Sequence, residues 1–170
     1  MGGWLFTEEE MSSKKPTAME RSQATLREMG CRACPMNRDK SLRNPKMEAT
    51  GSEEPLIYIL GEAPGKDEDR LGRQFVGRAG KLLREYLPDR LLSKIRWNNT
   101  INCHPPENRN PTAIEITCCE PRVVADIERT KPRAVFGFGG VPLKWGIGEE
   151  RMSVWQGRRV PVRIGQHHCY

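Results

Sequence analysis

Short apolar runs alternate with segments of helical period along most of this sequence. Residues 56–60 form an unbroken apolar run closed by Gly61, which is typical of a strand buried on both faces of a parallel sheet. Further strands are predicted near residues 96–101, 134–138 and 160–164. Because strands that alternate with helices build open α/β sheets, we expect ligands to bind at the carboxyl ends of these strands.

The helical segments have recognisable starts and stops. Residues 18–29 have helical propensity and are followed by a glycine, and residues 79–87 carry apolar side chains at helical spacing up to a proline. Thr112 begins a capping-box pattern, and Pro121 is suited to the first turn of a helix. Two successive helices are therefore predicted, one before Pro121 and one beginning there.

The chain divides into an amino-terminal arm and one folded domain. Residues 1–16 are polar, change from acidic to basic and have no strong period, so a flexible arm is predicted. The folded domain is expected to comprise residues 17–170, a length that fits one ordinary domain.

The charge of the sequence indicates a class of partner, and its hydropathy argues against a membrane span. Lysine and arginine outnumber aspartate and glutamate by 28 to 22, which gives a formal charge of +6 and favours a polyanionic partner without naming one. No apolar run approaches the ~20 residues of a membrane span, and the amino terminus lacks the pattern of a secretory signal. A soluble protein of the cytoplasm is expected.

Four of the six cysteines have a spacing that suits metal binding. Cys31 and Cys34 form a C-x-x-C pair, and Cys103 and Cys119 follow far downstream. Four thiolates suit either a structural zinc ion or a four-iron cluster, and the spacing alone does not choose between them. Cys118 is an alternative ligand to its neighbour, although adjacent side chains on a helix point about 100° apart. A redox pair or buried free thiols are the alternative interpretation.

The loop after the first predicted strand has the features of a ligand site. Gly61, Ala63 and Gly65 leave backbone N–H groups accessible, and Glu62 puts a carboxylate at the carboxyl end of the strand. The alternative is a tight turn between a strand and a helix without a ligand.

A second glycine-rich loop spans residues 72–80. It carries Phe75 between two arginines, Arg73 and Arg78, just before a predicted helix. Such a loop can stack an aromatic ring on a base and offer cations to phosphates. Taken alone, Phe75 would more often be an ordinary core residue.

Taken together, these motifs resemble the iron-sulfur uracil-DNA glycosylases known as family four, over residues 26–170. Each motif is weak alone, but their order and separations are highly specific. The matching segments are Cys31-x-x-Cys34-Pro35, Gly61 to Gly65, Gly72 to Gly80, Asn99 to Pro106 continuing through 108–112, and Cys119-Glu120-Pro121.

The resemblance implies a fold and a cofactor. The expected fold is a three-layer α/β/α sandwich on a central four-stranded parallel sheet. The expected cofactor is a structural [4Fe-4S] cluster, with a structural zinc ion as the alternative, held by Cys31, Cys34, Cys103 and Cys119.

The resemblance also implies roles for individual residues in excising uracil from DNA. Phe75 would stack on the flipped base, and the Asn99 amide would match N3–H and O4 of uracil. Glu62 would orient the attacking water, and His167 would donate to uracil O2 as negative charge develops. Gly61, Ala63 and Gly65 would contact the base.

The end of the sequence departs from the family pattern. Histidine and cysteine follow His167, where the family has His-Pro-Ser or His-Pro-Ala, and the family continues beyond the position of Tyr170. A domain truncated at its carboxyl end is therefore expected, either monomeric or part of a larger polypeptide, with uracil-containing DNA as its partner. The alternative function is a non-catalytic glycosylase-like DNA-binding module of a larger replication or repair protein.

Overall fold

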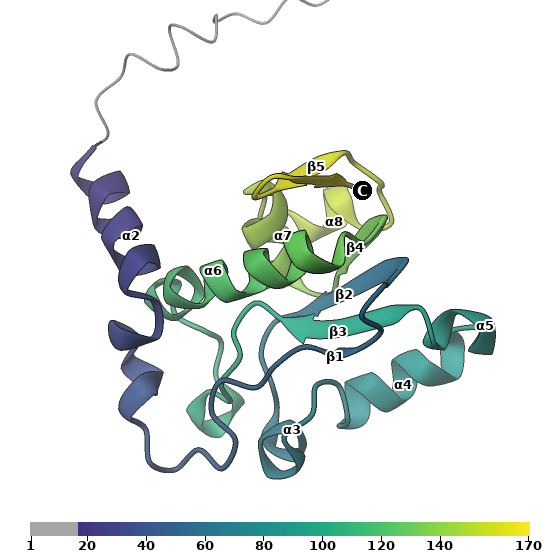
Figure 1. The fold of residues 1–170 in the computed structure, drawn as a ribbon, viewed down its shortest axis with the longest axis horizontal. Helices are drawn as coiled ribbons and strands as arrows, with labels where there is room; N and C mark the ends of the chain where they lie inside the picture. Colours follow the sequence, from purple (N-terminus) through teal and green to yellow (C-terminus); the bar gives the residue numbers. More distant parts are fainter. Residues whose placement is uncertain (1–16) are drawn as a thin grey trace, which may run out of the picture.

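A four-stranded sheet lies between layers of helices in the computed structural model, which describes residues 17–170 (Figure 1). The central strands are β1 (Thr50–Gly51), β2 (Ile57–Gly61), β3 (Ile95–Asn99) and β4 (Ala134–Gly137), and a separate two-stranded sheet contains β5 (Val162–Ile164) and β6 (His167–Cys169). The α-helices are α2 (Ala18–Met29), α3 (Lys66–Leu71), α4 (Arg78–Tyr86), α5 (Asp89–Leu92), α6 (Ala113–Thr130), α7 (Gly140–Ile147) and α8 (Met152–Trp155). Short 3-10 helices are η1 (Gly30–Arg32), η2 (Pro35–Arg38) and η3 (Pro106–Asn108).

The strand order places the carboxyl ends of three parallel strands side by side. The order is β1-β3-β2-β4, with β2 parallel to both β3 and β4 and β1 antiparallel to β3. The chain therefore leaves β2 for a strand on one side and later returns to a strand on its other side. Such a reversal of strand order is where α/β proteins bind ligands.

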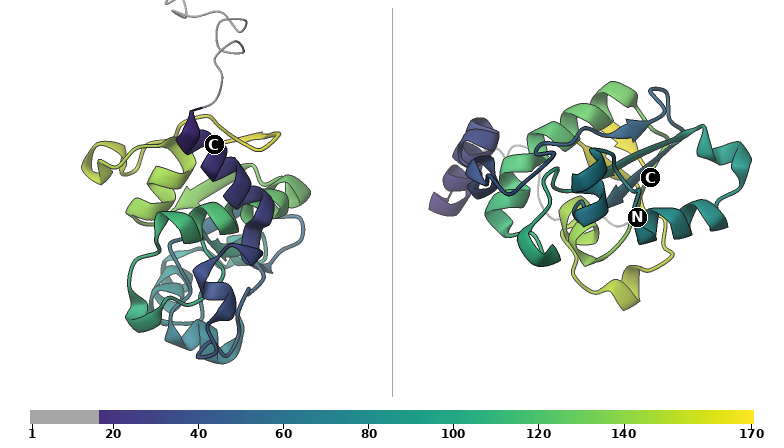
Figure 2. Two further views of the ribbon diagram at one scale, coloured as in Figure 1. Left: turned by 90° about the vertical axis from the view of Figure 1, so that its left-hand side faces the viewer. Right: turned by 90° about the horizontal axis from the view of Figure 1, so that it is seen from below.

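Both faces of the sheet are covered, as expected for a three-layer sandwich (Figure 2). Alternate residues of β2 point to opposite faces, so Tyr58 and Leu60 pack against α6 while Ile59 packs toward α4 and α5. The predicted α/β class with a central four-stranded sheet is confirmed.

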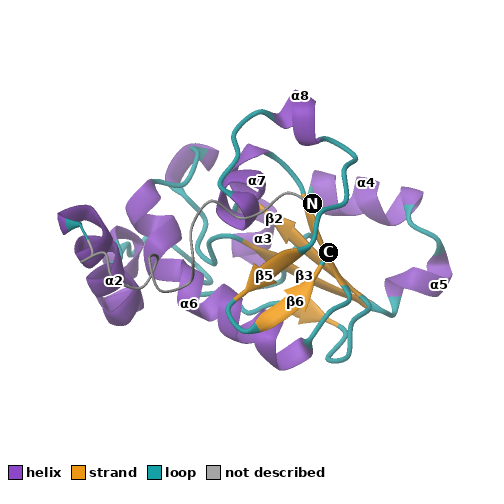
Figure 3. Ribbon diagram, turned by 90° about the horizontal axis from the view of Figure 1, so that it is seen from above, coloured by secondary structure: helices purple, strands orange, loops and turns teal. Residues whose placement is uncertain are grey.

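The fourth strand of that sheet is not the predicted one. Residues 162–164 form β5, which turns at Gly165 (φ 58°) and pairs antiparallel with β6 (Figure 3). The fourth strand is instead the two-residue β1, paired with Trp97 and Arg96. Its brevity and polar surroundings explain why no apolar pattern marks it.

The two helices predicted on either side of Pro121 are one continuous helix, α6. Proline costs the helix one backbone hydrogen bond. The helix continues because Val123 and Ile127, four residues apart, are fully buried against Tyr58 and Leu60 of β2, and this packing offsets that loss.

The other predicted helices form close to their expected bounds. Thr17 caps α2 through a capping box with Glu20, and Thr112 caps α6 in the same way with Glu115. The predicted arm, residues 1–16, lies outside the described residues. Within residues 17–170, no helix is both long and apolar enough to cross a membrane.

Candidate active site

Gly61 brings two predicted base-contacting side chains together at the carboxyl edge of the sheet. Gly61 and Asn99 are register partners at the ends of β2 and β3. A Cβ atom on Gly61 would lie 2.3 Å from Asn99 Oδ1 and 2.7 Å from Cζ of Phe75. Because any larger residue would displace both side chains, glycine is required here for close approach.

Glu62 follows at the same edge. Its backbone oxygen accepts a hydrogen bond from Thr100 Oγ1 at 2.5 Å, which fixes the start of the loop against β3. Its carboxylate extends toward the loop after β4, where Oε2 lies 3.8 Å from the position of a Cβ atom on Gly139. No group among residues 17–170 donates a hydrogen bond to this carboxylate, which leaves both oxygens able to accept from water or a ligand.

The two glycine-rich loops are joined by Glu68, a buried residue of α3. Its Oε1 accepts from the backbone N–H of Gly77 at 2.7 Å, and its Oε2 accepts from that of Gly65 at 3.1 Å. Charge-assisted bonds of this kind are among the stronger hydrogen bonds in proteins. No sequence pattern predicted this role, because Glu68 lies in an acidic run that looks like a solvated helix face.

Phe75 is held in an unusual backbone conformation. Its φ of 55° lies in the left-handed region, which is costly for a bulky residue. Arg84 Nη1 donates to the Phe75 carbonyl at 2.5 Å, and Gly80 lies so close that a Cβ atom there would be 1.8 Å from the same oxygen. The ring packs 5.4 Å from that of Trp97, centroid to centroid. The surrounding contacts therefore fix the ring beside Gly61.

The predicted thiol ligands come together in a second place, below α2 and beside α6. Cys31, Cys34, Cys103 and Cys119 line one cavity, and Cys118 lines it too. The backbone N–H of Lys46 donates to Cys103 Sγ at 3.2 Å, and that of Asn102 donates to Cys119 Sγ at 3.3 Å. Hydrogen bonds of this type stabilise thiolate ligands of metal centres.

Burial changes the acidity of three of these thiols. It raises the pKa of Cys34 and Cys103 and raises that of Cys119 to about 12. Among the described residues, no three histidine, cysteine or carboxylate side chains converge closely enough for a single metal ion. The four thiols that line this cavity match in number the ligands of a four-iron cluster, which attaches each cysteine to a different iron.

His167 does not reach the edge where Glu62 and Asn99 lie. Its Nε2 is 2.7 Å from the carbonyl oxygen of Pro132, just before β4 begins. Tyr170 pairs with Arg133 and Val135 through backbone hydrogen bonds, so this segment runs along the start of β4. The structure therefore brings Gly61, Glu62, Phe75 and Asn99 together, with Ala63 and Gly65 in the same loop, and puts His167 at the opposite end of the sheet.

The fold is that of an α/β protein with Gly61, Glu62, Phe75 and Asn99 at the carboxyl ends of parallel strands. The model of the uracil DNA glycosylase superfamily matches residues 49–167, and the chain belongs to this superfamily.

Named relatives agree with the family-four resemblance. The chain is 33% identical over 134 residues to a type-4 uracil-DNA glycosylase of Thermotoga maritima, covering 78% of this chain and 68% of the relative. It is 38% identical over 124 residues to the type-4 enzyme of Archaeoglobus fulgidus, covering 71% and 61%. A DNA polymerase of Bacillus phage SP01 is 33% identical over 109 residues, which is 60% of this chain and 12% of the polymerase.

Proposed function

We propose that this chain is a uracil-DNA glycosylase, which hydrolyses the bond between uracil and deoxyribose in DNA and leaves an abasic site for base excision repair. The observation that carries the proposal is the convergence of Phe75 and Asn99 on Gly61, directly beside the unpaired carboxylate of Glu62, in a member of the superfamily. Action on DNA implies that the protein works inside the cell.

The base would be read outside the helix. A base buried in a duplex is unreachable, so the nucleotide is extruded into a pocket and recognised there. The Phe75 ring supplies an apolar wall, and the Asn99 amide offers one N–H and one carbonyl oxygen, which match O4 and N3–H of uracil. Gly61, Ala63 and Gly65 let the backbone approach the base closely.

Glu62 would act on the sugar side of the reaction. As the bond from C1′ to N1 of uracil breaks, positive charge builds on the sugar and negative charge on the departing base. The Glu62 carboxylate orients a water for attack on C1′, favours the cation and takes the proton that the water loses. On the other side, the Asn99 N–H bond to O4 strengthens as the uracil becomes an anion.

Cationic side chains near the site suit the phosphates of the flipped strand. Lys66 is exposed at the start of α3, and Arg73 and Arg78 are exposed on the loop of residues 72–80. They would add a salt-dependent contribution to DNA affinity without reading sequence.

We propose further that Cys31, Cys34, Cys103 and Cys119 hold a [4Fe-4S] cluster, with structural zinc as the alternative. When bound, the group supplies a covalent clamp between the amino-terminal segment and the middle of the chain. The same two regions are linked by the ion pair of Arg27 on α2 with Glu120 on α6, at 2.8 Å. The donated N–H groups of Lys46 and Asn102 support thiolate ligation at this place.

A second candidate function is a glycosylase-like module within a larger replication or repair protein. The similarity to 12% of a phage DNA polymerase favours it. The presence of Glu62, Phe75 and Asn99 in one arrangement favours turnover over mere binding.

Excision assays separate the two candidates. The protein is incubated in excess over single-stranded and duplex oligonucleotides that carry one deoxyuridine, and abasic sites are detected by alkaline cleavage. We expect strand cleavage at the uracil and none at thymine or cytosine. Binding to these oligonucleotides without any excision would support the non-catalytic module instead.

A further inference from the structure

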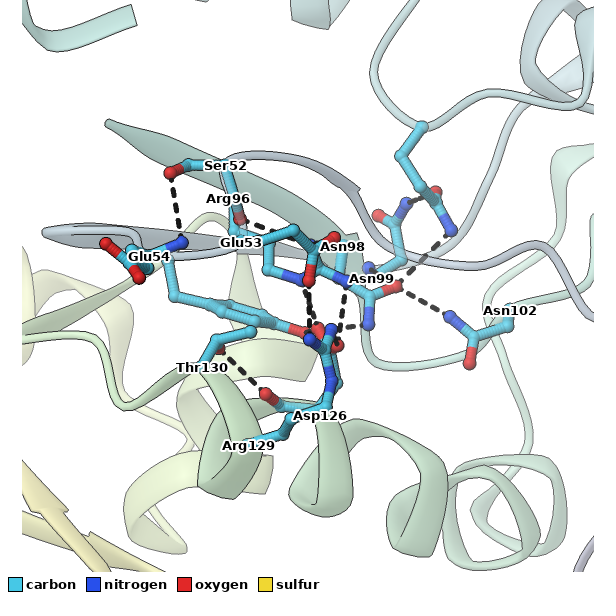
Figure 4. A network of polar contacts seen from close by, with 12 residues as sticks. Ser52, Glu53, Glu54, Arg96, Asn98, Asn99, Asn102, Asp126, Arg129 and Thr130 are labelled. Atoms are coloured by element: carbon cyan, nitrogen blue, oxygen red, sulfur yellow. Dashed lines mark hydrogen bonds and ion pairs between the residues drawn. The ribbon is translucent and has the colours of Figure 1, made fainter. Parts of the chain in front are cut away.

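A continuous chain of buried hydrogen bonds extends from Asn99 away from the ligand site. Asn99 Nδ2 donates to Gln74 Oε1 at 2.7 Å, and Gln74 Nε2 donates to Asn98 Oδ1 at 3.3 Å. Asn98 Nδ2 then donates to the Tyr58 hydroxyl at 2.8 Å, which donates to Asp126 Oδ2 at 2.8 Å. Figure 4 shows this network beside Asp126, with Asn98 and Asn99 in its midst.

The carboxylate of Asp126, at the far end of this hydrogen-bond chain, can only accept hydrogen bonds. Arg96 pairs with both oxygens of Asp126 at 2.7 and 2.8 Å, which keeps the carboxylate ionised. An ionised carboxylate has no proton to give, so the Tyr58 hydroxyl must donate to it. Burial, together with the nearby charge of Asp126, raises the pKa of Tyr58, and the hydroxyl therefore keeps the proton it donates. The Tyr58 oxygen is left to accept from Asn98.

A main-chain group fixes Asn98 independently. The backbone N–H of Asn99 donates to Asn98 Oδ1 at 2.9 Å, and a backbone amide cannot exchange its donor for an acceptor. Asn102 Nδ2 donates to the same oxygen at 2.7 Å. Asn98 is thus held in one orientation from both of its ends.

Because Asn98 has one orientation, the side-chain amides of Gln74 and then Asn99 are also held in one orientation. With Asn98 Oδ1 facing it, Gln74 must present its amide nitrogen to Asn98 and its oxygen to Asn99. All three amides are nearly inaccessible, with exposures of 1% for Gln74, 2% for Asn98 and 4% for Asn99, so solvent does not offer alternative partners. Asn99 therefore keeps one N–H and its Oδ1 for a ligand, in a set order.

We propose that Gln74 and Asn98 are positioning residues that fix the orientation of the Asn99 amide and thereby set the preference of this site for uracil over cytosine. This inference rests on the proposed function of Asn99. Uracil presents an acceptor at O4 and a donor at N3, whereas cytosine presents a donor at N4 and an acceptor at N3. To bind cytosine equally well, the Asn99 amide would have to turn over.

Reversing the Asn99 amide is unfavourable at each step of the hydrogen-bond chain. A reversed Asn99 would put Oδ1 against Gln74 Oε1, and reversing Gln74 as well would put its oxygen against Asn98 Oδ1. Asn98 cannot follow, because the Asn99 backbone N–H would then lose its acceptor inside the protein. A buried unpaired group is thus left behind wherever the reversal stops, and uracil is favoured.

Binding to uncleavable oligonucleotides tests the proposal. Single strands with one 2′-fluoro-2′-deoxyuridine or one 2′-fluoro-2′-deoxycytidine resist cleavage, because the fluorine disfavours the sugar cation, and single strands avoid differences in base pairing. The measurement is the ratio of the two Kd values for the full chain. We expect wild type to prefer the uracil strand by at least about tenfold, since a site built for hydrogen bonding rejects a mismatched partner.

Gln74→Met should reduce this preference to about twofold or less, because the Asn99 amide can then turn either way. Gln74→Glu should keep the preference when its buried carboxyl group is protonated, because the O–H then donates to Asn98 Oδ1 and the other oxygen accepts from Asn99 Nδ2. Thr130→Val is the matched control, since it removes a buried hydroxyl that donates to the Asp126 backbone carbonyl, outside the directional chain. If Gln74→Met does not fold, Gln74→Ser replaces it, because a water in the vacated space can donate or accept.

The results distinguish a failure of the positioning role of Gln74 from a failure of the proposed function. Loss of the ratio in Gln74→Met, with retention in Gln74→Glu and Thr130→Val, supports the positioning role. An unchanged ratio in the methionine and serine variants, or equal loss in the glutamate variant, overturns it while wild-type excision stands. If wild type neither excises uracil nor prefers the uracil strand, the proposed function itself fails.

Discussion

The carboxylate of Glu68 accepts a hydrogen bond from the backbone N–H of Gly77 at 2.7 Å, which connects the two glycine-rich loops. Its second oxygen accepts from Gly65, so one buried side chain fixes both loops that border the ligand site. The positions of Gly61, Glu62 and Phe75 therefore depend on a residue outside the set proposed to read the base.

Glu68→Ala should lower the free energy of unfolding by at least about 2 kcal/mol, because two buried N–H groups lose their acceptor. Uracil excision should fall by about tenfold or more as the loops loosen. Urea denaturation and single-turnover assays measure the two effects. Asp67→Ala is the neighbouring control, since its carboxylate is exposed and pairs with the exposed Arg70, and its effect should stay within about 0.5 kcal/mol. Equal effects at the two positions would contradict the account.

Gly80→Ala should damage the Phe75 loop. The new Cβ atom would lie 1.8 Å from the Phe75 carbonyl, and relieving that clash should cost at least about 2 kcal/mol of stability and most of the activity. Gly146→Ala is a matched substitution in α7, where nothing lies within 4 Å of the added atom. There the greater helix propensity of alanine should leave stability unchanged or raise it by up to about 1 kcal/mol. Thermal unfolding of the two variants compares them directly, and a stable, active Gly80→Ala would be the contrary result.

Serine at Cys31, Cys34, Cys103 or Cys119 should abolish the brown colour of the purified protein and lower its unfolding temperature, because one missing thiolate opens the clamp. Cys169→Ser is the control, since that thiol is buried in the apolar cluster with Ile164 and far along the chain from the cavity. Iron and sulfide analysis with visible absorption spectra checks this. A colourless wild type that contains zinc would favour the alternative metal.

Cys118 tests the ligand assignment separately. It lines the same cavity and lies beside Cys34, but Cys119 is the one that receives a backbone hydrogen bond on its sulfur. Cys118→Ser should therefore keep the colour, and Cys119→Ser should lose it. The reverse pattern of absorption would assign Cys118 as the ligand.

Asp126 should make stability depend on pH in the acid range. Burial alone would raise the pKa of Asp126, but hydrogen bonds from Arg96, Arg129 and Tyr58 outweigh it and hold that pKa below its usual range. Since the folded-state pKa is depressed, the stabilisation is complete above the unfolded value of about 3.9 and is lost as pH falls through the folded value. Denaturation curves from pH 7 downward should show the wild-type advantage over Asp126→Asn shrinking only below about pH 4. An advantage that is independent of pH would contradict this.

The sequence predicted the parts of the site that lie where apolar strands end. The run before Gly61 and the segment ending at Asn99 each mark a buried strand, and parallel strands bring their carboxyl ends together. The cysteine spacing likewise indicated a thiol cluster, because ligands must converge whatever the fold between them.

Other features had no local signal. Gln74 lies in a loop, and its role depends on Asn98 and Asn99 of β3, which only the folded chain brings near. After the turn at Gly165, β6 pairs with β5, and Tyr170 bonds to the backbone of Arg133 and Val135, which puts His167 at the opposite end of the sheet from Glu62 and Asn99. Such outcomes depend on tertiary pairing, which periodicity along the chain does not encode.

We propose that the Glu62 carboxylate, which follows the carboxyl end of β2, catalyses the excision of a uracil that Asn99 recognises. Its most direct test is the single-turnover rate of excision by Glu62→Gln and by wild type on one deoxyuridine strand, with the Kd of each protein for the uncleavable 2′-fluoro strand. We expect the excision rate of Glu62→Gln to be lower than that of wild type by at least about tenfold. Its Kd should differ by no more than about threefold, because the carboxylate stabilises the transition state rather than the bound base. A rate near that of wild type, at unchanged affinity, would contradict it.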